Sequence, residues 1–179
     1  MKILLGISAS IAAYKLPDIV HQLTVQGHDM HVVMTQHATQ FVTPFVLETL
    51  SHHPVMIEVM EEKDSRHIQH IDLAQSCDVF AIVPASANII GKLAHGIADD
   101  LLSTMALAVP AITKKFIAPA MNTVMYQNPA VMRNIRQLQD DGYQLIEPRT
   151  SLLACGVEGK GAMASVDTII QTLTQSTKK

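Results

Sequence analysis

Residues 2–26, KILLGISASIAAYKLPDIVHQLTVQ, contain a short apolar run followed by a longer amphipathic segment. Residues 2–7 (KILLGI) have the length and composition of a buried strand, and the apolar side chains of residues 10–26 recur at helical spacing up to Gly27. Pro17 lies inside the second segment, where we expect it to kink the helix or to shift its start. A strand that leads directly into a helix is the first unit of an α/β fold.

The same alternation continues along the chain. We predict these further elements: strand 29–34, helix 37–50, strand 78–83, helices near 87–95 and 99–108, strand 114–118, helix 128–141 and strand 143–146. Strands that alternate with helices predict a mostly parallel sheet with helices on both faces. The expected fold class is therefore α/β, a flavodoxin-like or Rossmann-like three-layer sandwich.

The chain has 179 residues, a length that predicts one domain over residues 1–179 with a flexible polar tail at about 175–179. Residues 148–163 (PRTSLLACGVEGKGAM) carry three glycines and no clear period, which predicts a long loop or flap. Loops of that length are often functional.

Composition excludes several classes of protein. A formal net charge of −3 without a basic block argues against nucleic acid as a partner. The chain has no apolar run near the ~18 residues of a membrane helix, so we expect no membrane partner. The two cysteines, Cys77 and Cys155, cannot form a disulfide framework, and we expect a cytoplasmic protein. Hydrophobic residues make up 48% of the chain and charged residues 16%, which favours burial of surface in a homo-oligomer.

The turn after the first strand, Gly6-Ile7-Ser8-Ala9-Ser10, places two hydroxyls and free backbone N–H groups at a helix N-terminus, where an anion is favoured. Only one glycine is present, and no acidic residue follows the second strand at Thr35, which argues against a dinucleotide such as NAD. A phosphate of a mononucleotide is compatible with this turn. The alternative is that Ser8 or Ser10 only caps the helix.

Three predicted strands end in small or polar residues. These ends are Thr35, residues 84–88 (PASAN) and residues 119–122 (PAMN). In a parallel sheet such ends lie at one edge together with the first turn, and ligands bind there. Ser86 and Asn122 have a structural alternative as helix caps.

Three further side chains carry possible chemistry. His67 and His70 are three residues apart and suit metal ligands, a general base, or two exposed polar residues. No cysteine or carboxylate pattern completes a zinc set, so we expect no metal site, and a single acid-base histidine at His70 is the better functional candidate. We expect Cys77 to be buried and Cys155, in the glycine-rich segment, to reach a ligand.

Four segments together resemble the flavin-containing cysteine decarboxylases, in particular phosphopantothenoylcysteine decarboxylases. They are residues 6–15 (GISASIAAYK), 70–88 (HIDLAQSCDVFAIVPASAN), 119–129 (PAMNTVMYQNP) and 154–164 (ACGVEGKGAMA). The resemblance spans nearly the whole chain, and the order and spacing of the segments make it specific. Three residues depart from the family pattern: Tyr126 stands where tryptophan is usual, Asp100 where asparagine is usual, and Ala9 where a second glycine is common.

The resemblance implies an FMN cofactor and a set of site residues. The implied FMN contacts are Ser8, Ala9, Ser10, Thr35, Ser86, Ala87, Asn88, Ile89 and Ala120. The essential histidine matches His70, the substrate-binding residues match Asn122 and Met125, and the proton donor matches Cys155.

The implied reaction is FMN-dependent decarboxylation of 4′-phosphopantothenoylcysteine to 4′-phosphopantetheine in coenzyme A biosynthesis. Oxidation of the substrate thiol by FMN first creates an electron sink for the carboxylate, and Cys155 supplies a proton when the resulting enethiol is reduced. The resemblance also implies a homotrimer, with a dodecamer as a further assembly. The alternatives are a peptidyl-cysteine oxidative decarboxylase, a flavin prenyltransferase and a non-catalytic phosphatase-regulating subunit.

Overall fold

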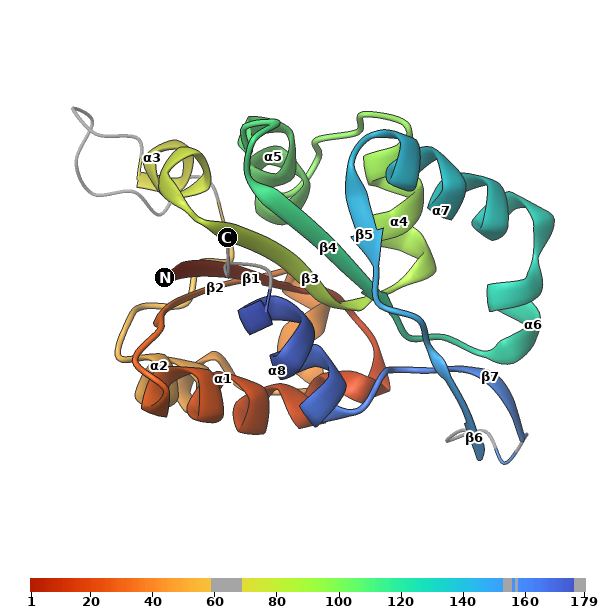
Figure 1. Ribbon diagram of the computed structural model, residues 1–179, viewed down its shortest axis with the longest axis horizontal. Coiled ribbons are helices and arrows are strands. Elements are labelled where there is room, and N and C mark those ends of the chain that lie inside the picture. Colours follow the sequence, from red (N-terminus) through yellow and green to blue (C-terminus); the bar gives the residue numbers. More distant parts are fainter. Residues whose placement is uncertain (59–68, 153–155, 157, 176–179) are drawn as a thin grey trace.

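The computed structural model describes residues 1–58, 69–152, 156 and 158–175. Five parallel strands form the central sheet in the order β2-β1-β3-β4-β5 (Figure 1). The strands are β1 (Lys2–Ile7), β2 (Asp29–Met34), β3 (Val79–Ala85), β4 (Lys114–Pro119) and β5 (Tyr143–Leu145). The sheet confirms the predicted α/β class.

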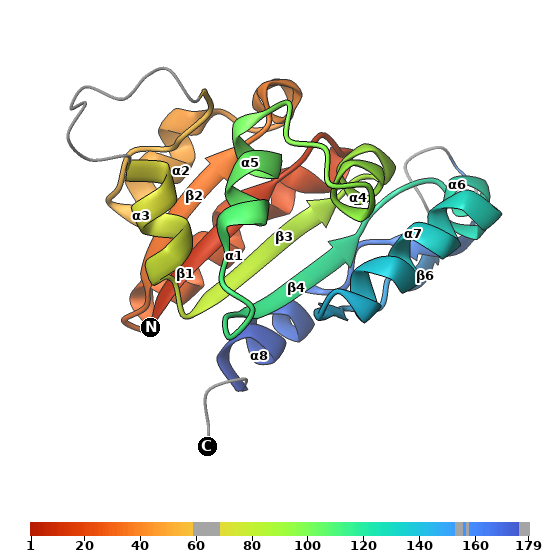
Figure 2. The same cartoon turned by 90° about the horizontal axis from the view of Figure 1, so that it is seen from above.

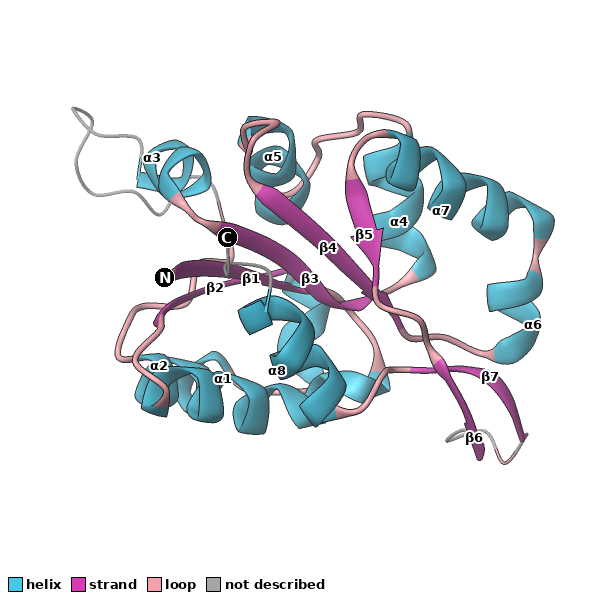
Figure 3. Ribbon diagram, viewed as in Figure 1, coloured by secondary structure: helices cyan, strands magenta, loops and turns pink. Residues whose placement is uncertain are grey.

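Helices cover both faces of the sheet (Figure 1; Figure 3). One face carries α1 (Leu16–Val25), α2 (Pro44–Ser51) and α8 (Val166–Gln175), and the other carries α3 (Gln69–Ser76), α4 (Ala87–Ala94), α5 (Leu101–Ala108) and α7 (Pro129–Asp140). Alternate residues of β1 enter different cores, because successive strand side chains point to opposite faces. Ile3 and Leu5 pack with α1 and α8, whereas Leu4 packs with α4 and α5.

The strand order places a topological switch between β1 and β3. From β1 the chain moves to one side of the sheet to form β2, and it then crosses to the other side to form β3 (Figure 2). In open α/β sheets a crevice opens outside the carboxyl ends of the strands at this point, and ligands bind in it.

Two predicted helices are each divided in the structure. Residues 10–26 form the 3₁₀-helix η1 (Ile11–Lys15) followed by α1, which has Pro17 in its first turn. Helix 37–50 was predicted wrongly as continuous, because the structure has the 3₁₀-helix η2 (Gln36–Gln40) and then α2. Pro44 is the cause, since a residue before proline avoids helical angles, and Thr43 is extended with ψ 140°.

The segment predicted as a loop, residues 148–163, contains an antiparallel hairpin. Its strands are β6 (Arg149–Leu152) and β7 (Glu158–Ala162), which pair only with each other. Three helices were not predicted: α3, α8 and the short α6 (Thr123–Gln127). Within the described part of the chain, no helix has the length and apolar character needed to cross a membrane.

Asp100, one of the departures from the family pattern, begins α5. Its Oδ1 accepts a hydrogen bond from the Ser103 N–H at 2.8 Å, and the Ser103 hydroxyl accepts one from the Asp100 N–H, which completes a capping box. Lys92 Nζ lies 2.7 Å from Asp100 Oδ2. Burial alone raises the pKa of Asp100, but the hydrogen bonds from Lys92 and Ser103 together lower it below its ordinary value.

We predict that Asp100→Ala lowers the free energy of unfolding by about 1–2 kcal/mol near neutral pH, because the cap is lost. Asp100→Asn keeps a capping oxygen and should lose less. The folded-state pKa of Asp100 is lowered, so its stabilisation is present above the unfolded-state pKa and disappears as the pH falls through the folded-state value. Urea unfolding should therefore show the difference between Asp100→Ala and wild type shrinking in acid. Equal losses for the two variants would contradict the capping role.

Candidate functional site

Ser8 joins the ends of β1 and β3 at the topological switch. Its hydroxyl donates to the Pro84 carbonyl at 2.8 Å and accepts from the Ser86 N–H at 2.8 Å. The side chain is 1% exposed. Ser8 therefore fixes the two turns next to the crevice, and most of its hydrogen-bonding capacity is used within the protein.

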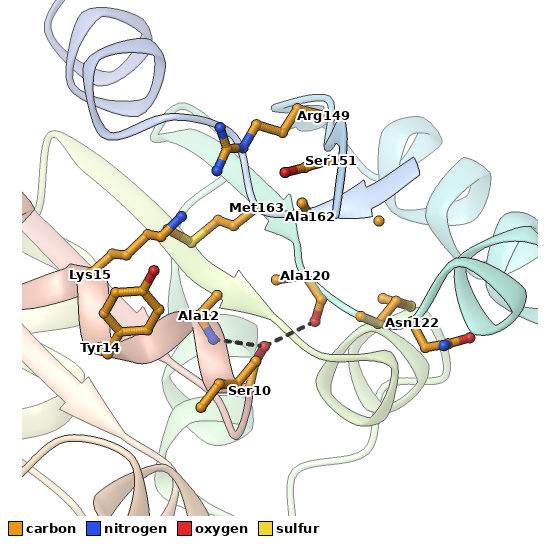
Figure 4. Close-up of a pocket in the computed structure, with 13 residues that line it drawn as sticks. Ser10, Ala12, Tyr14, Lys15, Ala120, Asn122, Arg149, Ser151, Ala162 and Met163 are labelled. Atoms are coloured by element: carbon orange, nitrogen blue, oxygen red, sulfur yellow. Dashed lines mark hydrogen bonds between the residues drawn. The ribbon is translucent and has the colours of Figure 1, made fainter. Parts of the chain in front are cut away.

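A second set of hydrogen bonds joins the first turn to the end of β4 (Figure 4). The Ser10 hydroxyl donates to the Ala120 carbonyl at 3.1 Å and accepts from the Ala12 N–H at 3.4 Å, which caps η1. The Ala120 N–H donates to the Ala85 carbonyl at 3.1 Å. The ends of three strands are thus held at one edge of the sheet.

The N-terminus of α4 opens on the same edge. Ser86 caps this helix by accepting from the Ile89 N–H at 3.4 Å. Ala87 and Asn88 form the first turn, where backbone N–H groups have no acceptor within a helix and favour an anion. The Ile89 side chain is buried in the core, so this residue can offer a ligand only its backbone.

Thr35 provides a direct test of whether this crevice fits a ligand. Its N–H donates to the Ile7 carbonyl at 3.0 Å, which places it beside the first turn. Its Oγ1 atom is buried and has no hydrogen-bond partner among the described residues. Because an unpaired buried hydroxyl is costly, Thr35 suits a polar group of a bound molecule. The backbone donors at the first turn and at the N-terminus of α4 suit the phosphate of a mononucleotide such as FMN.

A cavity of about 450 Å³ extends from Ser10 and Ala120 to the hairpin (Figure 4). It is lined by η1, by the residues after β4 and by β6 and β7. Ser8, Thr35 and the N-terminus of α4 are absent from its described lining. Lys15 of η1 and Arg149 of β6 both line the cavity, and no acidic residue belongs to its described lining. Neither cation has an ion pair within the described part of the chain, so the cavity favours a ligand that carries negative charge.

Gly161 allows the hairpin to lie close to the end of β4. The Met121 N–H donates to the Gly161 carbonyl at 3.0 Å. Gly161 has φ +151°, and a Cβ at this position would collide with the Met121 carbonyl oxygen. Only glycine permits both this conformation and this contact. The contact sets the position of Arg149 and Ser151 relative to Asn122, all of which line the cavity.

Asn122 lines the cavity and also caps α6. Its Oδ1 accepts a hydrogen bond from the Val124 N–H at 2.8 Å, so the helix cap considered from the sequence is present. Met125 is exposed and lies outside the described lining. Tyr126 is 4% exposed and packs in the core with α4 and α7, so it does not face the cavity.

His70 is separated from this cavity in a single chain. It lies on α3, is 7% exposed and is absent from the described cavity lining. His67 and Cys155 lie outside the described residues. Cys77 is buried as predicted, and burial raises the pKa of its thiol to about 11.

The sequence analysis did not identify Lys15 and Arg149 as residues of the site. The short distance in sequence between Lys15 and the first turn could have indicated Lys15, but no sequence signal indicated Arg149.

The family model described as "Flavoprotein" matches residues 1–178. A probable phosphopantothenoylcysteine decarboxylase of Streptococcus mutans is 51% identical over 172 residues, which cover 96% of each chain. The coenzyme A biosynthesis bifunctional protein CoaBC of Bacillus subtilis is 44% identical over 94% of this chain, but this chain spans only 41% of that protein.

Two solved structures have the same fold throughout. A mutant PPC decarboxylase complexed with pantothenoylaminoethenethiol superposes with a TM-score of 0.88 and 32% identity, covering 99% of this chain and 98% of that one. The FMN-binding protein AtHal3 has a TM-score of 0.85 and 33% identity, covering 99% and 96%. The chain therefore belongs to the Flavoprotein family.

We predict that Thr35→Val weakens FMN binding by about tenfold, because valine has the same shape but no hydroxyl for the ligand. The apoprotein should be at least as stable as wild type, since the hydroxyl removed has no partner among the described residues. Fluorescence titration of apoprotein with FMN and urea unfolding measure the two effects. Thr39→Val is the matched control, because Thr39 is on the adjacent η2 and donates to the Gln36 carbonyl. Wild-type FMN affinity in Thr35→Val would remove Thr35 from the cofactor site.

Proposed function

We propose that this chain is an FMN-dependent carboxy-lyase that converts 4′-phosphopantothenoylcysteine to 4′-phosphopantetheine in coenzyme A biosynthesis. The observation that carries the proposal is the cavity that extends from Ser10 and Ala120, at the carboxyl ends of the strands, to Asn122 and two cations. Similarity to a probable phosphopantothenoylcysteine decarboxylase over 96% of the chain supports it. We further propose that residues 1–179 act as one domain and that the enzyme works in the cytoplasm, where a thiol product stays reduced.

FMN is held by the turns at the carboxyl edge of the sheet. The proposed contacts are Ser8, Ala9, Ser10, Thr35, Ser86, Ala87, Asn88, Ile89 and Ala120. Ser8 acts mainly by positioning the turns, because its hydroxyl already bonds Pro84 and Ser86. When bound, FMN supplies the oxidising power that makes loss of the substrate carboxylate possible.

Asn122 orients the substrate in the cavity. Its Oδ1 accepts a hydrogen bond from the Val124 N–H, and this bond fixes the orientation of the Asn122 side chain. Its position in the lining supports contact with the amide or carboxylate of the substrate. Met125 is proposed to contact the substrate where α6 is exposed. Cys155 is the proposed proton donor.

A second copy of the chain completes the reaction site. Support comes from the separation of His70 from the described cavity lining and from exposed apolar side chains around the cavity and on α6: Ile11, Tyr14, Val124 and Met125 are 48–75% exposed. Burial of such side chains between subunits would stabilise an oligomer. We propose a homotrimer, with a dodecamer as a further assembly, in which His70 of one subunit reaches the cavity of another.

Lys15 and Arg149 are proposed to hold the phosphate of the substrate. Both line the cavity without an acidic neighbour in its described lining. An arginine fork and a lysine ammonium together match the oxygens of a phosphate. A peptide that ends in cysteine has no phosphate to offer this pair.

The decarboxylase reaction is tested with purified holoprotein. Wild type should release carbon dioxide from 4′-phosphopantothenoylcysteine and form 4′-phosphopantetheine, whereas a peptide ending in cysteine should not react. His70→Asn should keep its FMN and its oligomeric state but lose decarboxylation by about 100-fold or more, the scale of a lost acid-base group. Mass spectrometry of the products and the flavin absorbance provide both readouts. An active peptide substrate, or full activity in His70→Asn, would reject the assignment.

Substrate specificity tests the two cations. Lys15→Gln and Arg149→Gln should raise KM for 4′-phosphopantothenoylcysteine by about tenfold or more, since each removes a charge-assisted bond. KM for the same substrate without its phosphate should change little, and so should FMN affinity. Arg136→Gln, on the exposed face of α7, is the matched control. If FMN affinity falls instead, the two cations hold the cofactor phosphate.

A further inference from the structure

Three metal-ligating side chains converge at the amino end of β2, at the opposite edge of the sheet from the crevice. His53 Nε2 lies 2.8 Å from Asp29 Oδ1, and His31 Nε2 lies 3.2 Å from the same oxygen. The two imidazole rings are stacked, with centroids 4.1 Å apart. One carboxylate oxygen thus faces two imidazole nitrogens.

The backbone brings these residues together from two segments. Asp29 and His31 are two residues apart in β2 and lie on one face of the strand. His52 ends α2 in a left-handed conformation with φ 62°, which turns the chain back toward β2. The segment then runs along the strand, because the Met56 N–H donates to the Val32 carbonyl at 3.1 Å. His53 is therefore held beside His31.

One of the two histidines in this cluster makes no hydrogen bond to the carboxylate. Asp29 accepts a hydrogen bond from His53, but the 3.2 Å approach of His31 lacks hydrogen-bond geometry. His31 Nε2 is consequently buried without a hydrogen-bond partner among the described residues. The nearest group to this buried nitrogen is thus a carboxylate oxygen at poor hydrogen-bond geometry, which leaves the nitrogen poorly satisfied.

The arrangement has the dimensions of a metal site. The three donor atoms all lie within 4.8 Å of one another. A tetrahedral zinc ion with ligands at about 2.0–2.2 Å needs donors about 3.3–3.6 Å apart, and the two stacked imidazole rings must turn so that both nitrogens face the ion. Two imidazoles and one carboxylate are ligands that zinc and related divalent ions bind. The side chains of Asp29 and His53 are 44% and 38% exposed, which gives the ion an entry path.

We propose that Asp29, His31 and His53 bind one divalent transition-metal ion of the zinc class, with water as the fourth ligand. The ion ties the edge strand β2 to the segment after α2. Asp29 is the first residue of β2, whereas Thr35, beside the proposed FMN site, follows the last residue of that strand. The ion therefore lies away from the decarboxylation site and has a structural role. His67 and His70, the pair considered from sequence, are not members of this set.

Zinc binding is measured by equilibrium dialysis and elemental analysis of FMN-loaded protein without a histidine tag. Wild type should bind one Zn²⁺ per chain at this site. Asp29→Asn and His53→Ala should each weaken the Kd by at least about tenfold, since loss of even an outer-shell partner costs 10- to 100-fold. His52→Asn is the matched control, because asparagine tolerates the left-handed conformation of the neighbouring residue. His70→Asn controls for zinc at the reaction site. Both controls should keep the wild-type Kd.

The outcomes separate an ion site from a purely hydrogen-bonded cluster. Zn²⁺ should also raise the Tm of wild type but not that of Asp29→Asn, because only a folded protein with the site gains stability from the ion. Absence of saturable Zn²⁺ binding in wild type would overturn the proposal. So would wild-type affinity in His53→Ala, or an equal loss of affinity in His52→Asn. The flavin absorbance of each variant reports that the fold is retained.

Discussion

The buried hydroxyl of Ser8 fixes the geometry on which the site depends. It bonds both the Pro84 carbonyl and the Ser86 N–H, and so it joins β1 to β3 where the chain changes sides of the sheet. Without it, two backbone groups in a largely buried turn would lose a partner. The positions of Ser10 and the α4 N-terminus relative to each other follow from this link. A single hydroxyl thus converts two separate strand ends into one ligand-binding edge.

The sequence predicted the central sheet well because parallel strands covered on both faces are continuous apolar runs. The range 29–34 predicted for β2 matches Asp29–Met34, and β1 also has the predicted bounds. Prediction failed where local signals compete. Pro44 divides an apolar segment that otherwise resembles one helix, and the hairpin of β6 and β7 has too few buried residues to show a period of two. These errors lie outside the central sheet and leave its topology unchanged.

The candidate site was predictable only in the parts that follow strand ends. A parallel fold alone places Ser10 and Ala120 at one edge, and the structure joins them by a hydrogen bond. Arg149 enters the cavity through the hairpin, whose position depends on a contact between Gly161 and Met121. The cluster around Asp29 likewise requires the pairing of two distant segments. Such contacts depend on tertiary structure, and the spacing of residues in one sequence does not reveal them.

Two different kinds of structure form the walls of the cavity. The mononucleotide edge consists of strand ends that are joined by buried hydrogen bonds, so its geometry is rigid. The opposite wall consists of a hairpin that pairs only with itself and that meets the rest of the chain closely at Gly161. Residues such as Arg149 and Ser151 can therefore change without disturbing the sheet. A change in the hairpin would alter one wall of the cavity, whereas Lys15 and Asn122, which follow the strand ends, would keep their places.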